Sequence, residues 1–317
     1  MNIIMTIDII GGGSIGLLLA AALRQSGAAV RVWTRTHEQA RALSKEGLVV
    51  RDLNQHAIHL EQIEAYPLDQ AGELLREQKA EVTCALLVVK QTHINHELLG
   101  SLSKLPLSED GIMVCYQNGV GHIEKLTEVL PQDALFRAVT TEAAKRLSGH
   151  EVKHTGSGTT YLEEREAVDP KRRNQLVKLD KQLNDAGFPT FLSKHIHEMI
   201  TRKLLVNAVI NPLTALLRLP NGQLLKKEQR VELMRTIFEE IRDVYSREGI
   251  HLTEEDWAYM LNVCQNTADN TSSMLADVLA HRPTEIEAIT GAILQMADRH
   301  GIQVPLQRML YQLIQAL

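Results

Sequence analysis

A chain of 317 residues is longer than one hydrophobic core usually serves, so its length favours two domains. Hydrophobic residues make up 44% and charged residues 23% of the chain, which is ordinary for a globular protein. The net charge of -5 and the aromatic content of 4% disfavour nucleic-acid binding, which usually relies on a basic face or on stacking rings.

The first half of the chain alternates short apolar runs with helical patterns. Because strands that alternate with helices form parallel sheets, this half predicts a doubly wound, Rossmann-type α/β domain. The run at 82–89 is almost continuously apolar, as a strand buried on both faces requires. Strands are predicted at 6–10, 30–33, 82–89, 112–116 and 135–140, and helices at 14–25 and 38–45.

The pattern changes in the second half. The turn-rich, β-branched stretch 154–161 predicts a hairpin or a strand edge. After about His195 the pattern is almost wholly helical, with long amphipathic runs. We therefore expect an α/β dinucleotide-binding domain at 1–194 and an all-α domain at 195–317.

A glycine-rich loop follows the first predicted strand and opens the first predicted helix. In such a loop the first glycine makes the tight turn, the second lets the backbone approach a pyrophosphate, and the third lets helix and strand pack closely. Free N–H groups at the helix start would then meet the phosphates. This context predicts dinucleotide binding by Gly11, Gly12, Gly13, Ser14, Ile15 and Gly16, which fit G-x-G-x-x-G.

The end of the second predicted strand indicates which dinucleotide is bound. An acidic residue there would hold the ribose hydroxyls of NAD, but residues 30–37 contain no carboxylate. Arg35 stands where a 2′-phosphate would need a partner, and a guanidinium can bind phosphate with two parallel hydrogen bonds. An isolated arginine is more often a solvated surface residue, but the missing acid favours NADP(H).

A polar stripe runs along a predicted helix in the second domain. Lys203, Asn207 and Asn211 are spaced i, i+4, i+8 and so share one helix face, while apolar residues fill the other positions. Buried asparagines need hydrogen-bond partners, and a lysine can donate a proton to a developing alkoxide. The stripe predicts a polar ligand site, although each residue alone could be structural. Pro212 should kink or end this helix.

Two further positions depend on context. Asn118-Gly119 would ordinarily be only a turn, but here it follows an apolar strand at the edge where doubly wound sheets bind ligands. Thr284 and Glu287 fit a capping box with Glu285 in the first helical turn. The pattern alone gives Glu285 no catalytic role.

The rest of the chain predicts a cytoplasmic protein without a bound metal. Its start shows no signal peptide, and its uninterrupted apolar stretches fall well short of the roughly 18 residues that a membrane span needs. The three cysteines match no metal-ligand spacing. The helical half has enough apolar surface for a homodimer, which the sequence does not decide.

Taken together, these motifs resemble those of the ketopantoate reductase family over essentially the whole chain. The resemblance implies reduction of 2-dehydropantoate to pantoate with NADPH, a step toward pantothenate and coenzyme A. The motifs that carry it are the glycine loop, Arg35, Lys90, Asn118-Gly119, Arg202-Lys203-Leu204 with Asn207, Asn211-Pro212-Leu213-Thr214-Ala215, Asn221-Gly222, Ser272-Ser273-Met274 and Thr284-Glu285.

The resemblance also implies roles for single residues. Lys203 would be the general acid, and Glu285 would lie near both Lys203 and the nicotinamide. The keto acid would be bound by Asn207, Asn211, Asn221 and Ser273. NADPH would contact the glycine loop together with Arg35, Lys90, Asn118, Ala144 and Glu285.

The chain departs from the family pattern at two places near the cofactor. His93 stands where relatives commonly carry glutamine, and Glu142 stands where histidine is familiar. Two other functions remain open from the sequence. One is an NADP-dependent dehydrogenase of a different small hydroxy acid, and the other is a non-catalytic NADPH-binding redox sensor, which would leave the Lys203 stripe unexplained.

Overall fold

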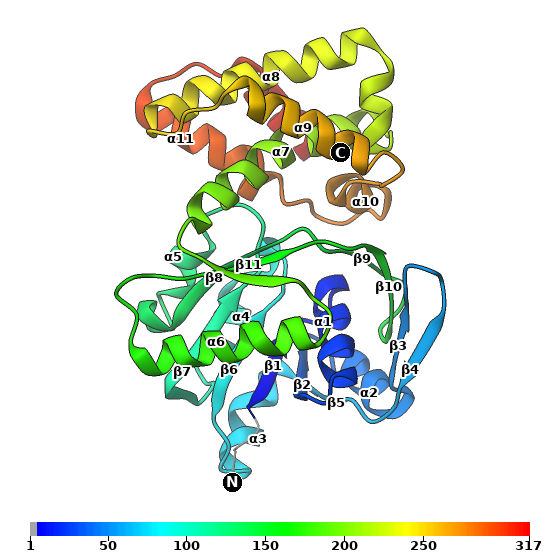
Figure 1. Cartoon of the computed structure of the whole chain (residues 1–317), viewed down its shortest axis with the longest axis vertical. Helices are drawn as coiled ribbons and strands as arrows, with labels where there is room; N and C mark the ends of the chain where they lie inside the picture. Colours follow the sequence, from blue (N-terminus) through cyan, green and yellow to red (C-terminus); the bar gives the residue numbers. More distant parts are fainter. Residues whose placement is uncertain (1–4) are drawn as a thin grey trace. The chain divides into compact units, whose positions relative to one another are not determined.

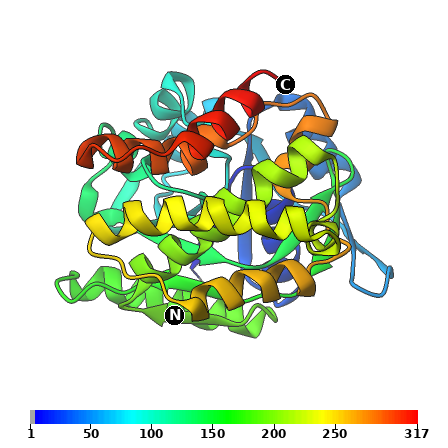
Figure 2. The same cartoon turned by 90° about the horizontal axis from the view of Figure 1, so that it is seen from above.

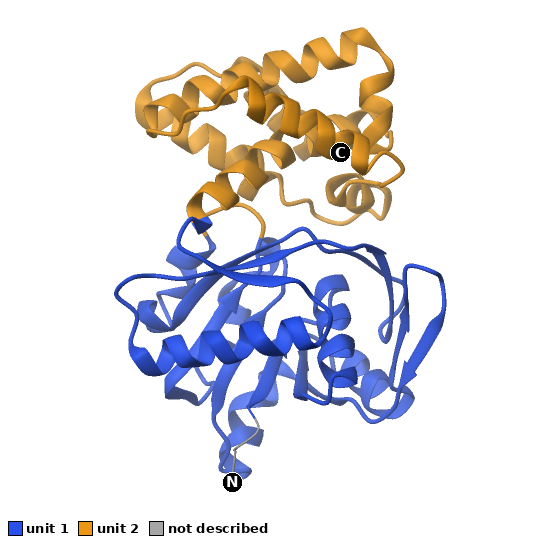
Figure 3. Ribbon diagram, in the orientation of Figure 1, with its two compact units in different colours: residues 1–117, 122–196 blue, residues 118–121, 197–317 orange. Residues whose placement is uncertain are grey.

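The computed structural model describes residues 5–317 and divides the chain into two compact units (Figure 3). Unit 1 comprises the chain up to Gln117 together with His122–Ile196. Unit 2 comprises His197–Leu317 and the short segment Asn118–Gly121. This short segment lies far earlier in the sequence than the rest of unit 2, and nothing in the sequence pattern indicated that it belongs there.

Unit 1 is built on an eight-stranded sheet with the order β12-β11-β8-β7-β6-β1-β2-β5. Neighbouring strands are parallel except for β8 and β11, which are antiparallel. The prediction of a Rossmann-type parallel sheet is confirmed. The strands are β1 (Thr6–Ile10), β2 (Ala29–Thr34), β5 (Glu64–Pro67), β6 (Val82–Leu87), β7 (Leu107–Cys115), β8 (Leu135–Thr140), β11 (Thr160–Glu163) and β12 (Thr190–Ser193).

The helices of unit 1 connect these strands (Figure 1). Of the predicted elements, the first strand, the first helix and the strand β8 have the bounds that the sequence indicated. The remaining predicted elements are present with shifted ends. The helices are α1 (Ser14–Gln25), α2 (His37–Glu46), α3 (Ala71–Glu77), α4 (His96–Leu102), α5 (His122–Leu126) and α6 (Pro170–Asp185), with 3-10 turns at Leu68–Gln70, Gln91–His93 and Gln132–Ala134.

A second, four-stranded sheet was not predicted. Its order is β4-β3-β10-β9, formed by Ala57–Leu60, Leu48–Arg51, Glu151–Gly156 and Ala143–Arg146. The stretch 154–161, predicted to be a hairpin or a strand edge, contains the end of β10 and the start of β11, but the two strands do not pair with each other and neither is at a sheet edge. β10 belongs to this small sheet, where it pairs with β9 and β3, whereas β11 pairs with β8 and β12 in the large sheet.

Helix α1 packs on the large sheet and also against β9 and β10 of the small sheet. Contact with both sheets explains why α1 buries consecutive residues from Gly16 to Ala21 rather than one stripe. The residues that start the helix are thereby held between two layers of strands. This packing positions the glycine loop that precedes α1.

The core of unit 1 contains a buried ion pair between Asp8 and Arg31. The Asp8 carboxylate on β1 accepts hydrogen bonds from Arg31 Nε at 2.8 Å and Nη2 at 2.9 Å, and from Trp33 Nε1 at 2.7 Å. All three residues are buried, and the contacts tie β1 to β2 next to the loop. Burial raises the pKa of Asp8, while the arginine opposes that rise.

Unit 2 is helical, and no strand follows β12 in the described chain, as the sequence predicted. Its buried side chains form one continuous apolar core, which includes Leu205, Phe238 and Ile293. The helices are α7 (Ile196–Leu217), α8 (Glu228–Arg247), α9 (Glu254–Asn266), α10 (Ser273–Leu279), α11 (Ala292–His300) and α12 (Pro305–Gln315), with a 3-10 turn at Asn221–Lys226 and a π-helical turn at Glu287–Gly291.

Helix α7 differs from the sequence predictions in two ways. It continues through Pro212 to Leu217, so the proline does not end it. It is also the one helix within residues 5–317 that could cross a membrane by length and composition alone. Counting uninterrupted apolar residues missed this property, because polar residues interrupt the run. More than half of the apolar segment is buried in the protein, as in the core helix of a globular domain.

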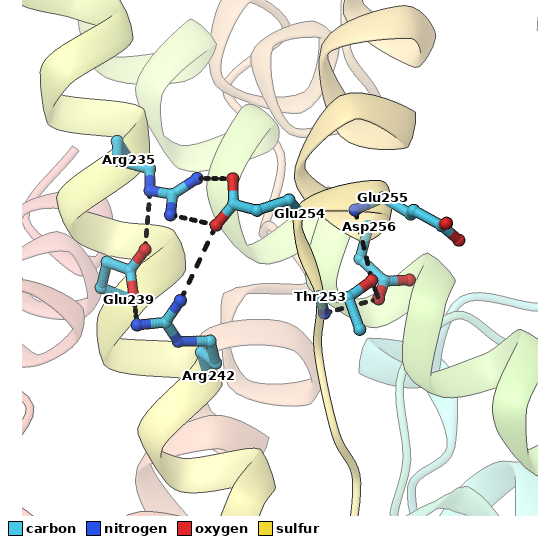
Figure 4. Close-up of polar contacts among 7 residues, drawn as sticks. All are labelled: Arg235, Glu239, Arg242, Thr253, Glu254, Glu255 and Asp256. Carbon is cyan, nitrogen blue, oxygen red and sulfur yellow. Dashed lines mark hydrogen bonds and ion pairs between the residues drawn. The ribbon is translucent and has the colours of Figure 1, made fainter.

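Charged side chains join α8 to α9 and α9 to α7. Figure 4 shows Arg235 of α8 paired with Glu254 of α9 at 2.6 Å. In the same view Thr253 and Asp256 form a capping box that starts α9. Asp256 also accepts a hydrogen bond from Arg202 Nε at 3.2 Å, which ties α9 to α7 one residue before Lys203. Figure 2 gives a second view of α8 and α9.

Candidate functional site

The glycine loop lies where the order of the large sheet changes direction. From β1 the chain moves outward to β2 and β5 and then crosses to β6 on the other side of β1. Ligands of doubly wound sheets bind at the carboxyl ends of the strands at such a switch point. Gly11 follows β1 directly, and its N–H donates to the carbonyl of Trp33 on β2 at 2.8 Å.

Two of the glycines meet requirements that other residues cannot. Gly11 has a φ of +120°, which L-residues rarely adopt, and a Cβ there would lie 2.9 Å from Val89 Cγ1. A Cβ on Gly16 would overlap the carbonyl oxygen of Gly11. Gly13 is the N-cap of α1, whose first turn has neither a side-chain cap nor an acidic residue. The positive end of the helix therefore suits an anionic phosphate.

Side chains from outside the motif hold this loop in place. Gln39 Nε2 donates to the carbonyl of Gly12 at 2.7 Å and to that of Gly149 at 2.9 Å. Arg146 on β9 donates from Nη1 to the same Gly12 carbonyl at 3.1 Å, and its backbone N–H donates to Ser14 Oγ at 3.0 Å. Ile15 is partly buried against the core of unit 1. No sequence pattern indicated Gln39 or Arg146, because both come from elements outside the βαβ unit.

The two cations predicted for the cofactor follow the strands on either side of β1. Arg35 comes directly after β2 and is exposed, with its Nη1 3.3 Å from His93 Nε2. Lys90 lies shortly after β6 and precedes the 3-10 turn that contains His93. Since β1, β2 and β6 are parallel neighbours, both side chains start from the same edge of the sheet as the glycine loop.

Ala144 lies on β9, in the small sheet beside α1. The unusual Glu142 just before it has a buried carboxylate that accepts from Gly158 N–H at 2.9 Å and contacts His154 Nε2 at 2.8 Å. The departure from the family pattern is therefore matched by a histidine on the neighbouring strand β10. The pair joins the turn before β9 to the connection that follows β10.

In unit 2, the stripe on α7 combines polar groups with an apolar surrounding. Asn211 is buried, whereas Lys203 and Asn207 have intermediate exposure. Although part of Lys203 reaches the surface, burial of its ammonium group lowers the pKa to about 8 from the ordinary 10.5. The nearby carboxylate of Glu285 opposes this shift and raises the pKa. At neutral pH most Lys203 side chains are therefore protonated, but the pKa lies only about one unit above the pH.

Glu285 is buried, and its segment contacts Asn118–Gly121, the short part of unit 2 that comes from earlier in the chain. Its Oε2 accepts a hydrogen bond from Asn118 Nδ2 at 3.3 Å. Gly119 has a φ of +76°, and a Cβ there would overlap the carbonyl of Ala288. These contacts explain why Asn118–Gly121 groups with unit 2. The structure thereby brings together Lys203, Glu285 and Asn118, which come from three separate parts of the sequence.

The predicted capping box around Glu285 is wrong. Thr284 Oγ1 accepts from the N–H of Ile286 at 3.4 Å, but Glu287 instead accepts from the hydroxyl of Tyr311 and lies 3.5 Å from Gln295 Nε2. The cause is the π-helical turn at Glu287–Gly291, which changes the direction of the side chains that follow Glu285. Such turns are frequent at functional sites.

The remaining predicted substrate residues lie around a polar cluster between α7 and the loop before α10. Thr214 Oγ1 donates to the α7 backbone, at 2.9 Å from the carbonyl of Asn211, and lies 2.7 Å from Ser272 Oγ. Ser272 caps α10, whose first residue is Ser273. The N–H of Asn221 donates to the carbonyl of Asn270 at 3.1 Å. Asn211, Asn221 and Ser273 therefore lie on segments joined by hydrogen bonds.

The structure also bears on metal binding. Among residues 5–317, no three His, Cys, Asp or Glu side chains form a group that could hold a metal ion.

The parallel sheet, the glycine loop at its switch point and the uncapped start of α1 define a Rossmann-type dinucleotide-binding protein. The helical unit adds a partly buried lysine, Lys203, and a buried carboxylate, Glu285, to that class of fold.

Comparisons with known proteins identify the family. The family described as "Ketopantoate reductase PanE/ApbA" matches residues 7–167, and "Ketopantoate reductase PanE/ApbA C terminal" matches residues 195–317. A 2-dehydropantoate 2-reductase of Bacillus subtilis (strain 168) is 34% identical over 99% of this chain and 97% of its own length. One of Shigella flexneri is 33% identical over 98% of this chain and 94% of its own. The chain belongs to the ketopantoate reductase family.

Solved structures agree on the fold over nearly the whole chain. The probable 2-dehydropantoate 2-reductase of Bacillus subtilis has a TM-score of 0.77 at 30% identity, covering 98% of this chain and 99% of that one. D-mandelate dehydrogenase, solved with NADH and anilino(oxo)acetate, has a TM-score of 0.88 at 25% identity, covering 98% and 97%. The fold thus occurs in enzymes that are named for different acid substrates.

Proposed function

We propose that this protein reduces 2-dehydropantoate to pantoate with NADPH, with Lys203 as the proton donor. The position of the Lys203 ammonium near the buried carboxylate of Glu285, in a chain that belongs to the ketopantoate reductase family, is the observation that carries the proposal. A lysine whose pKa is about 8 is mostly protonated at neutral pH and gives up its proton more readily than an ordinary lysine.

The residues of unit 1 fit NADPH. The uncapped first turn of α1, the approach that Gly13 leaves open and the positive φ of Gly11 suit a pyrophosphate. Arg35, with no carboxylate in residues 30–37, suits a 2′-phosphate. Gly12, Ser14, Ile15, Gly16, Lys90 and Ala144 complete the proposed cofactor set in this unit. When bound, NADPH supplies the hydride for the keto carbon.

The residues of unit 2 act on the substrate. As negative charge develops on the keto oxygen, the Lys203 ammonium stabilises it electrostatically and then transfers a proton to it. The released lysine is neutral, and the carboxylate of Glu285 favours its reprotonation because it stabilises the charged form. Asn118 donates to Glu285 and so helps to hold that carboxylate in place.

Uncharged groups bind the rest of the keto acid. Asn207 and Asn211 extend the Lys203 face of α7 and can donate amide N–H groups to the substrate carboxylate. Ser273 and Asn221 contribute from the segments that the Thr214 and Asn270 contacts bring next to α7. Lys203 is the one cation in this proposed set, and the four uncharged residues orient the keto carbon toward it.

The nearest alternative is an NADP-dependent dehydrogenase of another small hydroxy acid. It is favoured by the likeness to D-mandelate dehydrogenase, whose solved structure holds NADH and anilino(oxo)acetate. The testing experiment follows the loss of NADPH absorbance with purified protein and 2-dehydropantoate, beside NADH and a panel of other 2-keto acids. Rapid oxidation only with 2-dehydropantoate and NADPH supports the proposal. Turnover with another acid supports the alternative, and silence with every acid would revive the sensor hypothesis.

We also propose that the protein is cytoplasmic and forms a homodimer through its helical unit. Met309 and Leu313 on α12, and Leu317 just after its end, are spaced at i, i+4 and i+8 and are 56%, 45% and 62% exposed. Such an apolar stripe at helical spacing is suited to contact with a second copy. Sedimentation equilibrium tests the dimer, with M309K/L313K as the variant expected to be monomeric.

A further inference from the structure

Asn221 has a side-chain oxygen without a hydrogen-bond partner. Asn221 is 9% exposed, and its Oδ1 is buried with no hydrogen-bond partner among residues 5–317. The other end of the amide is occupied, because Nδ2 donates to Thr267 Oγ1 at 2.9 Å. A buried amide oxygen without a donor is costly, and native proteins usually satisfy such groups.

The orientation of this amide follows from the hydroxyl of Thr267. Thr267 Oγ1 donates its single proton to the carbonyl of Val263 at 2.7 Å, one helical turn earlier in α9. The oxygen can then only accept from Asn221, so it selects Nδ2 rather than Oδ1 as its neighbour. Thr267 thereby leaves Oδ1 as the group that faces away from it.

The backbone of Asn221 is equally constrained. Its N–H donates to the carbonyl of Asn270 at 3.1 Å, and its own carbonyl accepts from Cys264 Sγ at 2.9 Å. The next residue, Gly222, donates to the carbonyl of Ala268 at 3.0 Å, and a Cβ on Gly222 would collide with Ala268. Asn221 is therefore fixed at both backbone groups and at one end of its side chain.

We infer that Thr267 is a positioning residue that makes Asn221 a hydrogen-bond acceptor, so that this protein selects 2-keto acids that carry a hydroxyl group. The inference rests on the proposed function and deepens it. In 2-dehydropantoate the carboxylate is ionised and the keto group has no proton, so the hydroxyl is the one donor that the substrate offers. A keto acid without a hydroxyl leaves Oδ1 buried and unpaired.

The size of the expected preference follows from the cost of that unpaired group. Sites built to hydrogen-bond a hydroxyl reject analogues that lack it more strongly than apolar pockets reject a change in size. For one buried acceptor we expect a preference of roughly 10- to 100-fold in kcat/KM. The comparison uses 2-dehydropantoate and 3,3-dimethyl-2-oxobutanoate, the same keto acid without the hydroxyl.

The experiment measures both substrates with NADPH for the wild type and for the T267V, T267S and N221L variants of the full chain. In T267V the valine cannot accept a hydrogen bond, so the Asn221 amide is free to turn, and the preference should fall toward 1. T267S keeps the hydroxyl and should restore it. A purely structural role for Thr267 would instead lower the rates for both substrates together.

N221L guards against failure of T267V to fold, since it removes the acceptor itself and should also abolish the preference. Thermal unfolding and NADPH binding identify which variants are folded. A wild type that reduces both acids equally well, or folded T267V and N221L variants that keep the wild-type preference, would overturn the inference while the proposed function stands. A wild type that reduces neither acid would overturn both.

Discussion

Replacement of Glu285 by glutamine should move the pH dependence of the reaction to lower pH. Glu285 raises the pKa of Lys203, whereas burial lowers it, and the balance is about 8. Glutamine keeps the shape of the side chain but removes the charge. The opposing contribution is then lost, and the pKa of Lys203 should fall below 8.

The sign and the size follow from the protonated form being the proton donor. In the wild type about nine-tenths of Lys203 is protonated at pH 7 and about one-tenth at pH 9, so kcat/KM should be flat below pH 8 and fall tenfold per unit above it. Each unit by which E285Q lowers the pKa is worth about 1.4 kcal/mol and costs about tenfold in activity on the alkaline side.

The assay is kcat/KM for 2-dehydropantoate from pH 6.5 to 10, with the midpoint of the alkaline limb as the readout. The midpoint is preferable to the rate, because Glu285 is also proposed to lie near the cofactor. E287Q is the matched control: Glu287 lies two residues further along and contacts Tyr311 rather than the proposed site. A midpoint that is unchanged or raised in E285Q would refute the coupling of Glu285 to Lys203.

Three other changes test the remaining parts of the site. Lys203→Met should reduce kcat by about 100-fold or more with little change in NADPH affinity, because it removes the general acid; unchanged turnover in steady-state assays would contradict that role. The same variant should be more stable by about 3 kcal/mol at pH 7, since a lysine whose folded pKa is about 8 rather than 10.5 opposes folding while protonated. This gain should fade as the pH rises through 8 toward 10.5, which urea unfolding at several pH values can check. Arg35→Ala should raise KM for NADPH about 10-fold or more and leave KM for NADH nearly unchanged, because only the 2′-phosphate loses a partner; equal effects on both would indicate another role for Arg35. Gly16→Ala should abolish NADPH binding or lower Tm by several degrees, since its methyl group overlaps the Gly11 carbonyl, whereas Gly100→Ala on α4, with open space around it, should do neither in thermal-shift assays.

Local patterns were enough to predict the first βαβ unit. The glycine loop, the short strand before it and the helix after it are specified by residues adjacent in sequence, and their bounds agree with the structure. The small sheet was missed for the opposite reason. β3 pairs with β10 about a hundred residues away, and both strands are too short to show a clear period of their own.

In the candidate site, too, some features follow from local patterns and others depend on contacts between distant parts of the chain. The alignment of Lys203, Asn207 and Asn211 on one face follows from helical spacing alone, so the sequence could predict it. The carboxylate beside Lys203 could not be predicted from the pattern, because Glu285 resembles an ordinary first-turn acid and its capping box does not form. Thr267 also had no visible signal, since a threonine near a helix end is common.

By itself the sequence determined the fold class, the glycine loop, the absence of an acid after β2 and the polar face of α7, because each depends on residues a few positions apart. Only the tertiary structure decided which distant groups meet. Packing joins Asn118 to Glu285 across 167 positions, places Arg146 at the glycine loop and turns the Asn221 amide toward Thr267. These contacts depend on how helices and strands pack over long sequence separations, which no local pattern records.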